Sequence, residues 1–156
     1  MARLAHALEM DILVPTKPNR AKMDFDYQEM DVDTLFEAAD VLSIHVPLND
    51  DTQGLLSLKR LMSMPPNSIL INTARGGFID SEQLIYALEK GDLTHAYLDV
   101  LDAEPPYQPH PLIEHPSCTV TPHIAWASVN SRSRLMDGVV KNIKSFLEGK
   151  VTNSIV

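Results

Sequence analysis

The 156-residue chain has a single cysteine, few positive charges and no long apolar run. Because Cys118 has no cysteine to pair with, an intrachain disulfide is excluded, and the reducing cytoplasm is the expected compartment. No apolar stretch approaches the roughly 20 residues that a membrane span needs, and polar residues interrupt the opening segment where a signal peptide would be apolar. The formal net charge of -8 disfavours nucleic acid and anionic membranes, because both attract a positive field. A small molecule or another protein is therefore the expected partner.

Two kinds of catalytic site lack their sequence signatures. No Gly-x-Ser-x-Gly elbow follows an expected strand, which argues against a Ser-His-Asp hydrolase. The chain has six histidines, but their spacing matches neither a zincin helix nor a Cys-His finger. One hydrolase alternative remains, a metal-dependent enzyme in which His110, His115 and Glu104 converge on an ion. Metal analysis of the purified protein would show whether such an ion is bound.

Short apolar runs alternate with amphipathic segments along the chain. Strands are expected at residues 12–14, 41–47, 68–74, 95–101 and 118–122, and helices at the opening of the chain and at residues 32–40, 56–62, 80–91 and 131–148. Strands that are apolar throughout predict a parallel sheet covered on both faces, the doubly wound α/β fold. Asp80 is expected as an N-cap with Gln83 as its capping-box partner. The proline-rich segment 102–116 is expected to be a shaped surface loop rather than an interdomain linker.

Polar residues follow the expected strands at the edge where open parallel sheets bind ligands. They are His45, Thr73, Arg75, Asp99, Glu104 and His123. Arginine can bind a carboxylate through two parallel hydrogen bonds, histidine titrates near neutral pH, and a nearby glutamate favours imidazolium and fixes the tautomer. Such a set could protonate an oxygen beside a carboxylate. Each residue also has a structural interpretation, with Arg75 as a partner of Asp80, and the spacing alone does not decide between them.

Four segments, in this order, resemble the signatures of the D-isomer-specific 2-hydroxyacid dehydrogenases. They read "HVPLNDDTQGLL", "INTARGG", "LDVLDAEPP" and "TVTPHIAWAS". The last is most similar to the glycerate dehydrogenase and hydroxypyruvate reductase branch. The resemblance implies a Rossmann-like domain and an oxidoreductase that transfers hydride between NAD(P)H and the C2 carbonyl of a small 2-keto acid, such as hydroxypyruvate or glyoxylate. It also suggests a homodimer.

The resemblance assigns roles to individual residues. It implies that Arg75 binds the substrate carboxylate and keto oxygen, that His123 is the general acid-base, and that Glu104 supports His123. The histidine spacing leads us to expect no metal, and the sequence leaves open whether Trp126, beside the histidine, is a core residue or a lid. The alternative is a non-catalytic nucleotide-binding or protein-interaction module, which would not need this trio. The implied cofactor contacts are His45, Pro47, Thr52, Thr73, Ala74, Arg75, Asp99, His123 and Ala125.

Two features depart from the family pattern. The G-x-G-x-x-G loop is absent, because Gly54 is the first glycine, and Met1 falls inside the helix expected after that loop. Residues 1–156 are therefore expected to form a partial NAD(P)-binding domain without its central first strand or the preceding substrate domain, toward which helix 131–148 would return. Such a chain is expected to be inactive alone. In addition, Thr16, Lys17 and Arg20 follow the first strand where an acidic residue usually binds the adenosine ribose, so NADP is not excluded.

Overall fold

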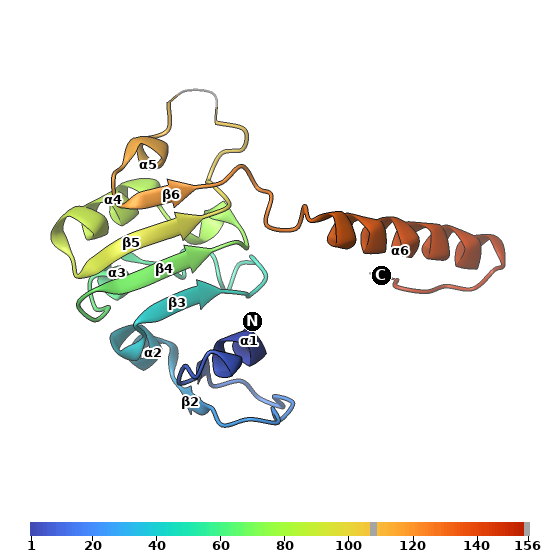
Figure 1. The fold of residues 1–156 in the computed structure, drawn as a ribbon, viewed down its shortest axis with the longest axis horizontal. Helices are drawn as coiled ribbons and strands as arrows, with labels where there is room; N and C mark the ends of the chain where they lie inside the picture. Colours follow the sequence, from blue (N-terminus) through green and yellow to red (C-terminus); the bar gives the residue numbers. More distant parts are fainter. Residues whose placement is uncertain (107–108, 155–156) are drawn as a thin grey trace. The chain divides into compact units, whose positions relative to one another are not determined.

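The computed structural model describes residues 1–106 and 109–154. These residues form two compact units, Met1–Val120 and Thr121–Val156. Figure 1 traces both along the chain. The predicted site residues are divided between the two units.

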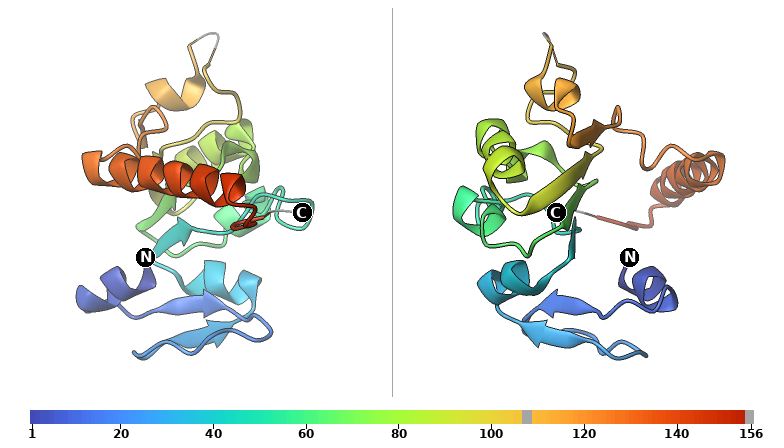
Figure 2. Two further views of the ribbon diagram at one scale, coloured as in Figure 1. Left: turned by 90° about the vertical axis from the view of Figure 1, so that its right-hand side faces the viewer. Right: turned by 60° about the vertical axis from the view of Figure 1, so that its left-hand side comes forward.

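Parallel strands form the framework of the first unit. A sheet of order β3-β4-β5-β6 contains β3 (Val41–Ile44), β4 (Ser68–Asn72), β5 (Leu93–Leu98) and β6 (Cys118–Val120). A separate pair contains β1 (Leu13–Pro15) and β2 (Gln28–Met30). Every pairing is parallel, which confirms the predicted α/β class. The β1–β2 pair lies beyond the β3 edge of the larger sheet (Figures 1 and 2).

The register of the larger sheet places apolar side chains in a row. Leu42 pairs with Leu70, Leu70 with Ala96, and Ala96 with Cys118. All four side chains are buried. This row is the centre of the hydrophobic core, and it explains why these strands are the most readily identified in the sequence.

Helices flank the strands in chain order. The first unit contains α1 (Ala2–Ala7), α2 (Val32–Ala38), α3 (Leu58–Leu61), the 3₁₀ helix η1 (Gly76–Phe78), α4 (Ser81–Lys90) and α5 (Pro111–Glu114). The second contains α6 (Val129–Leu147). Within the proline-rich segment, α5 buries Leu112, which supports a shaped loop, although residues 107 and 108 lie outside the described residues.

Some predictions about the elements were wrong in detail, and one strand was missed. The sequence did not predict β2, whose residues Gln-Glu-Met show no apolar alternation and are defined by pairing with β1. Strands β3, β4, β5 and β6 end at Ile44, Asn72, Leu98 and Val120, before the expected residues 47, 74, 101 and 122, because the chain turns into loops there. Asp80 does cap α4 by accepting from Gln83 N (3.0 Å), but the Gln83 side chain accepts from Leu58 N (2.8 Å) and so forms no capping box.

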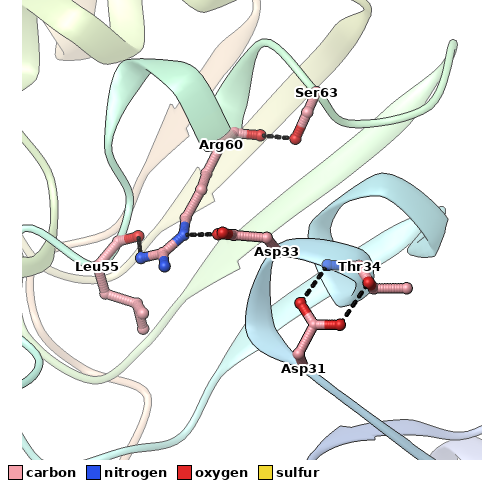
Figure 3. A network of polar contacts seen from close by, with 6 residues as sticks. All are labelled: Asp31, Asp33, Thr34, Leu55, Arg60 and Ser63. Carbon is pink, nitrogen blue, oxygen red and sulfur yellow. Dashed lines mark hydrogen bonds and ion pairs between the residues drawn. The ribbon is translucent and has the colours of Figure 1, made fainter.

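A polar network joins α2 to α3 (Figure 3). Arg60 donates from Nε to Asp33 Oδ1 (2.7 Å) and from Nη1 to Leu55 O (3.0 Å). At the start of α2, Asp31 accepts from Thr34 N (3.0 Å). Hydrogen bonds from the Thr34 hydroxyl and then from its backbone N–H lower the pKa of the Asp31 carboxyl. The two helices are therefore held to each other by charge as well as by the core.

Two helices expose apolar side chains. Helix α1 has no buried residue, and Leu4 and Leu8 are exposed. In α6, which Ser128 caps by accepting from Ser131 N (3.2 Å), the predicted apolar stripe is present but exposed. That stripe consists of Leu135, Val139, Ile143 and Phe146. Across the described ranges, no helix combines the length and apolarity that crossing a bilayer requires.

Candidate active site

The loops that follow β3, β4 and β5 touch one another at the carboxyl edge of the larger sheet. A Cβ added to Gly76, after β4, would lie 1.9 Å from Leu101 O, after β5. A Cβ added to Gly77 would lie 2.8 Å from Leu48 Cδ2, in the loop after β3. At Gly76 the neighbour is backbone, so only glycine permits such close approach there, whereas the Leu48 side chain beside Gly77 can rotate. The loop that carries Arg75 is therefore packed against both of its neighbours.

Asn72 fixes the backbone of the Arg75 loop. It is the last residue of β4 and is fully buried. Its Oδ1 accepts from Ala74 N (3.0 Å) and its Nδ2 donates to Arg75 O (2.8 Å), while its own carbonyl accepts from Asp99 N (2.9 Å). This role of Asn72 was not predicted from the sequence. Its signal is a buried carboxamide at the end of an otherwise apolar strand, because a buried polar group must find partners.

Replacing Asn72 with alanine is expected to lower the free energy of unfolding by about 2 kcal/mol, because the partly buried Ala74 N–H and Arg75 carbonyl lose their partner. Chemical denaturation of residues 1–156 measures this change. The control is Asn142→Ala, since Asn142 is exposed on α6, and a surface change of this kind is expected to stay within about 0.5 kcal/mol. Equal effects of the two substitutions would show that Asn72 does not hold the loop.

Arg75 is exposed at the edge of the sheet. Its Nη1 donates to Ala74 O (2.6 Å). The structural alternative, a pairing of Arg75 with Asp80, is not formed, because the Asp80 carboxylate caps α4. Thr73 is also exposed and Ala74 is half-buried. The guanidinium is therefore available at the surface where a ligand would approach.

The loop after β5 contains the two predicted carboxylates. Glu104 Oε1 accepts from Leu101 N (2.7 Å), so this side chain folds back on its own loop. Asp99, at 3% exposure, is buried, and its backbone is tied to β4 through Asn72. The two carboxylates thus differ, with one at the surface and one in the core.

The loop after β3 contains three of the predicted cofactor contacts. His45 Nε2 lies 2.8 Å from Ser43 Oγ, and desolvation, followed by the positive chain terminus, lowers the pKa of His45. Thr52 Oγ1 donates to Pro47 O (2.7 Å), and Thr52 N donates to Asn49 Oδ1 (3.1 Å). The hydrogen bond from the Thr52 hydroxyl therefore links two positions of this loop, and His45 and Pro47 remain exposed.

His123 begins the second unit in an unusual backbone conformation. Its φ is 55°, in the left-handed region, which for a non-glycine residue is strained and is found often at functional sites. Its N–H donates to Thr121 O (2.9 Å) and its carbonyl accepts from Trp126 Nε1 (3.0 Å). Trp126 is exposed, so of the two alternatives, a core residue or a lid, the structure does not support the core residue. Ala125, the last predicted cofactor contact, is exposed as well.

The histidines of the metal-site alternative have structural partners. His110 Nε2 lies 2.9 Å from Asp102 Oδ1, and its Nδ1 accepts from Leu112 N (3.3 Å) at the start of α5. His115 Nδ1 accepts from Ser117 N (3.1 Å). In residues 1–106 and 109–154, no group of three or more His, Cys, Asp or Glu side chains could hold a metal ion. Nothing in the described geometry favours the hydrolase.

The first unit is a doubly wound α/β domain with its polar loops gathered at the carboxyl edge of a parallel sheet. Domains of this class bind nucleotides at that edge. Arg75 and Glu104 belong to this unit, and His123 belongs to the second. The fold and the loops together are typical of a nucleotide-binding domain.

The chain belongs to the D-isomer specific 2-hydroxyacid dehydrogenases, because residues 1–125 match the model of the NAD binding domain of that family. It is 34% identical over 98% of its length to a hydroxypyruvate reductase of Blautia hydrogenotrophica, of which it covers 48%. It is 39% identical over 81% of its length to a glycerate dehydrogenase of Methylorubrum extorquens, of which it covers 41%. These relatives confirm the predicted branch.

A solved structure agrees with both comparisons. The NAD-complexed D-isomer specific 2-hydroxyacid dehydrogenase of Lactobacillus delbrueckii ssp. bulgaricus superposes with a TM-score of 0.88 at 27% identity, and the match covers 99% of this chain and 51% of that one. The chain therefore spans about half the length of the curated relatives it matches. The NAD-binding fold predicted from the sequence is confirmed.

Proposed function

We propose that this chain is the cofactor-binding part of an NAD(P)-dependent oxidoreductase that acts on small 2-keto and 2-hydroxy acids of the hydroxypyruvate and glyoxylate type. One observation carries the proposal: in a member of this family, Arg75 stands at the carboxyl edge of the sheet on a loop that Asn72 and Gly76 fix. The hydroxypyruvate reductase and glycerate dehydrogenase relatives support the substrate class.

The residues present fit the nicotinamide end of a dinucleotide. Thr73 and Ala74 offer small side chains beside a backbone that glycines bring close to neighbouring loops. No glycine precedes Gly54, so residues 1–53 supply no glycine-rich pyrophosphate loop. The residues that would hold the cofactor are His45, Pro47, Thr52, Thr73, Ala74, Arg75, Asp99, His123 and Ala125.

Three side chains share the chemistry in this proposal. When bound, the reduced nicotinamide supplies a hydride to the substrate C2 carbon. His123 gives a proton to the carbonyl oxygen and takes it back in the reverse direction. Arg75 orients the substrate carboxylate and stabilises negative charge that develops on the oxygen. Glu104 holds the protonated ring of His123. The presence of all three argues against the non-catalytic module.

The proposal extends to the organisation of the enzyme. The exposed stripe of α6 would pack on a substrate domain formed by polypeptide outside residues 1–156, toward which residues 131–148 return. The edges of β1 and β3 would be joined by one further parallel strand, because each lacks a partner on one side in the described sheets. The assembled enzyme is proposed to be a cytoplasmic homodimer.

Residues 1–156 alone are expected to bind NADH weakly and to reduce neither hydroxypyruvate nor glyoxylate. A phosphate cradle at a helix N-terminus supplies much of dinucleotide binding, and this chain has none of the required glycines. Fluorescence titration with NADH and a steady-state assay measure both properties. Tight binding or ordinary turnover by the chain alone would contradict the expectation.

Joining the chain to the N-terminal half of a related hydroxypyruvate reductase is expected to restore NAD(P)H-dependent reduction. This fusion tests the function itself. A fusion that folds and binds cofactor, yet reduces no 2-keto acid, would refute the proposed activity.

A further inference from the structure

The segment that follows β1 concentrates positive charge. Residues 16–22 contain Lys17, Arg20 and Lys22 and no Asp or Glu, in a chain whose formal net charge is -8. The segment begins at the carboxyl end of β1, the edge at which doubly wound sheets bind nucleotides. At this place an acidic residue accepts hydrogen bonds from a ribose 2′-hydroxyl, and a cation instead suits a 2′-phosphate. The charge of the segment therefore bears on which cofactor is bound.

A tight turn folds this segment back over β1. Arg20 N donates to Lys17 O (3.3 Å), with Pro18 and Asn19 between them. Asn19 has φ 56°, and proline followed by a residue with positive φ is typical of a type II turn. The turn returns the Arg20 guanidinium to the strand end, where Nη2 donates to Pro15 O (2.5 Å). Arg20 is therefore positioned at the edge of the sheet rather than in open solvent.

The charge of Arg20 is only partly compensated in the described structure. Its Nε is buried, and no acceptor among the described residues lies within hydrogen-bond distance. The nearest carboxylate oxygen, Glu29 Oε1, is 3.6 Å from that nitrogen, which is an ion pair but not a hydrogen bond. Asp24, the first acidic residue after this segment in the sequence, pairs with Arg3 at 3.0 Å. The buried Nε is not open to a ligand, but a planar guanidinium whose charge has no hydrogen-bonded carboxylate in the described structure is well suited to a phosphate.

The first residues of the segment complement Arg20. Thr16 N donates to Met30 O (2.8 Å), so the backbone is tied to β2 while the hydroxyl is exposed. Lys17 is exposed beside it. Hydroxyl, ammonium and guanidinium all donate hydrogen bonds, and two of the three are positively charged. A phosphate accepts at three oxygens and carries nearly two negative charges, so it matches this set better than a neutral hydroxyl does.

We propose that Thr16, Lys17 and Arg20 bind the 2′-phosphate of NADP(H), and that the enzyme prefers NADP(H) to NAD(H). This inference rests on the proposed function, which supplies the statement that a nicotinamide dinucleotide is bound. The new statement is that the preferred dinucleotide is NADP(H). It requires only the β1–β2 region of the first unit, which residues 1–156 contain.

A binding experiment on residues 1–156 tests the preference without turnover. Three probes are titrated by ligand-observed NMR: 2′,5′-ADP, 3′,5′-ADP and 5′-AMP. We expect 2′,5′-ADP to bind about tenfold more tightly than the other two, because its additional phosphate meets two cations. The 3′,5′-ADP probe carries its second phosphate on the ribose 3′ oxygen and has the same net charge as 2′,5′-ADP. A difference in affinity between these two probes therefore shows a site specific for the 2′-phosphate rather than a general attraction to phosphate. Equal affinities for the three, or binding of none, would overturn the inference.

Charge-removing variants assign the site. Lys17→Gln and Arg20→Gln are each expected to remove most of the preference for 2′,5′-ADP, while Lys59→Gln, an exposed cation of α3, should leave it unchanged. Because Arg20 contacts β1, thermal unfolding is used to check that the Arg20→Gln variant folds. Lys17 is exposed, so Lys17→Gln tests the site without this risk to folding. A preference that survives Lys17→Gln and a folded Arg20→Gln would overturn the assignment.

The fusion enzyme separates this inference from the proposed function. Its ratio of kcat/KM for NADPH over NADH should exceed about ten, as the binding preference requires. A fusion equally active with both cofactors would overturn the inference and leave the function intact. A fusion inactive with both would refute the function, whereas the 2′,5′-ADP titration would still decide the inference.

Discussion

Replacing His123 with alanine in the fusion enzyme is expected to lower kcat about 10²- to 10⁴-fold, because a positioned general acid contributes an effect of that size. The KM for the 2-keto acid should change little, since Arg75 and not His123 is the proposed ligand of the carboxylate. The backbone at this position is held on both sides, by Thr121 O and by the Trp126 side chain. Alanine should therefore remove the ring without moving the loop. Steady-state kinetics with hydroxypyruvate measures the effect.

The control for this experiment is His95→Ala. His95 lies on β5, where its Nε2 is 2.9 Å from Thr119 Oγ1, so it tests the loss of a histidine within the sheet rather than at its edge. It should keep most of the rate. A His123→Ala enzyme with ordinary kcat would refute the role of this residue.

Replacing Gly76 with alanine is expected to lower the free energy of unfolding by about 3 kcal/mol or more, at the upper end of overpacking effects. The new Cβ would lie 1.9 Å from Leu101 O, 2.1 Å from Leu101 C and 2.5 Å from Asp102 N. These are backbone atoms, so no side-chain rotation can relieve the overlap. The loops that carry Arg75 and Glu104 would have to separate. Denaturant unfolding of residues 1–156 measures the loss.

Gly138→Ala provides the matched control. Gly138 lies within α6 and has no neighbouring atom within 4 Å of its added Cβ. Alanine there should stabilise the helix by about 0.5 to 1 kcal/mol, because glycine loses more backbone entropy in a helix. An unchanged unfolding midpoint for Gly76→Ala would mean that the two loops do not make the close contact described.

The fold was predictable where local pattern and tertiary environment agree. Residues 68–72 are apolar and short, and they form the central strand β4. Asp80 and the apolar positions after it predicted α4 because a cap and a stripe are local signals. Strand β2 carries no such signal, since its three residues are strand only through backbone bonds to a segment 15 positions earlier in the register Leu13↔Gln28. Gln83 shows the same limit, because its partner Leu58 is distant in sequence.

The candidate site was predictable to the level of which residues stand at the sheet edge. Arg75 is exposed there, as strand order and the turn implied. The partners of these residues were not predictable. Asn72 reads as one more residue of a strand, although it fixes the loop, and the Thr52 hydroxyl bonds to Pro47 O. Such contacts depend on where two backbones meet, which no spacing along the chain encodes.

The hydrogen bond from Arg75 Nη1 to Ala74 O bears on the direction from which an anion can approach. A guanidinium offers a carboxylate two bidentate faces, an end-on face formed by Nη1 and Nη2 and a side-on face formed by Nε and Nη2. An anion on the end-on face would compete with Ala74 O for Nη1. The side-on face presents two parallel donors without that competition. In the proposed enzyme, the substrate carboxylate would therefore lie beside the guanidinium rather than beyond its tip, which fixes the plane of the carboxylate relative to the loop.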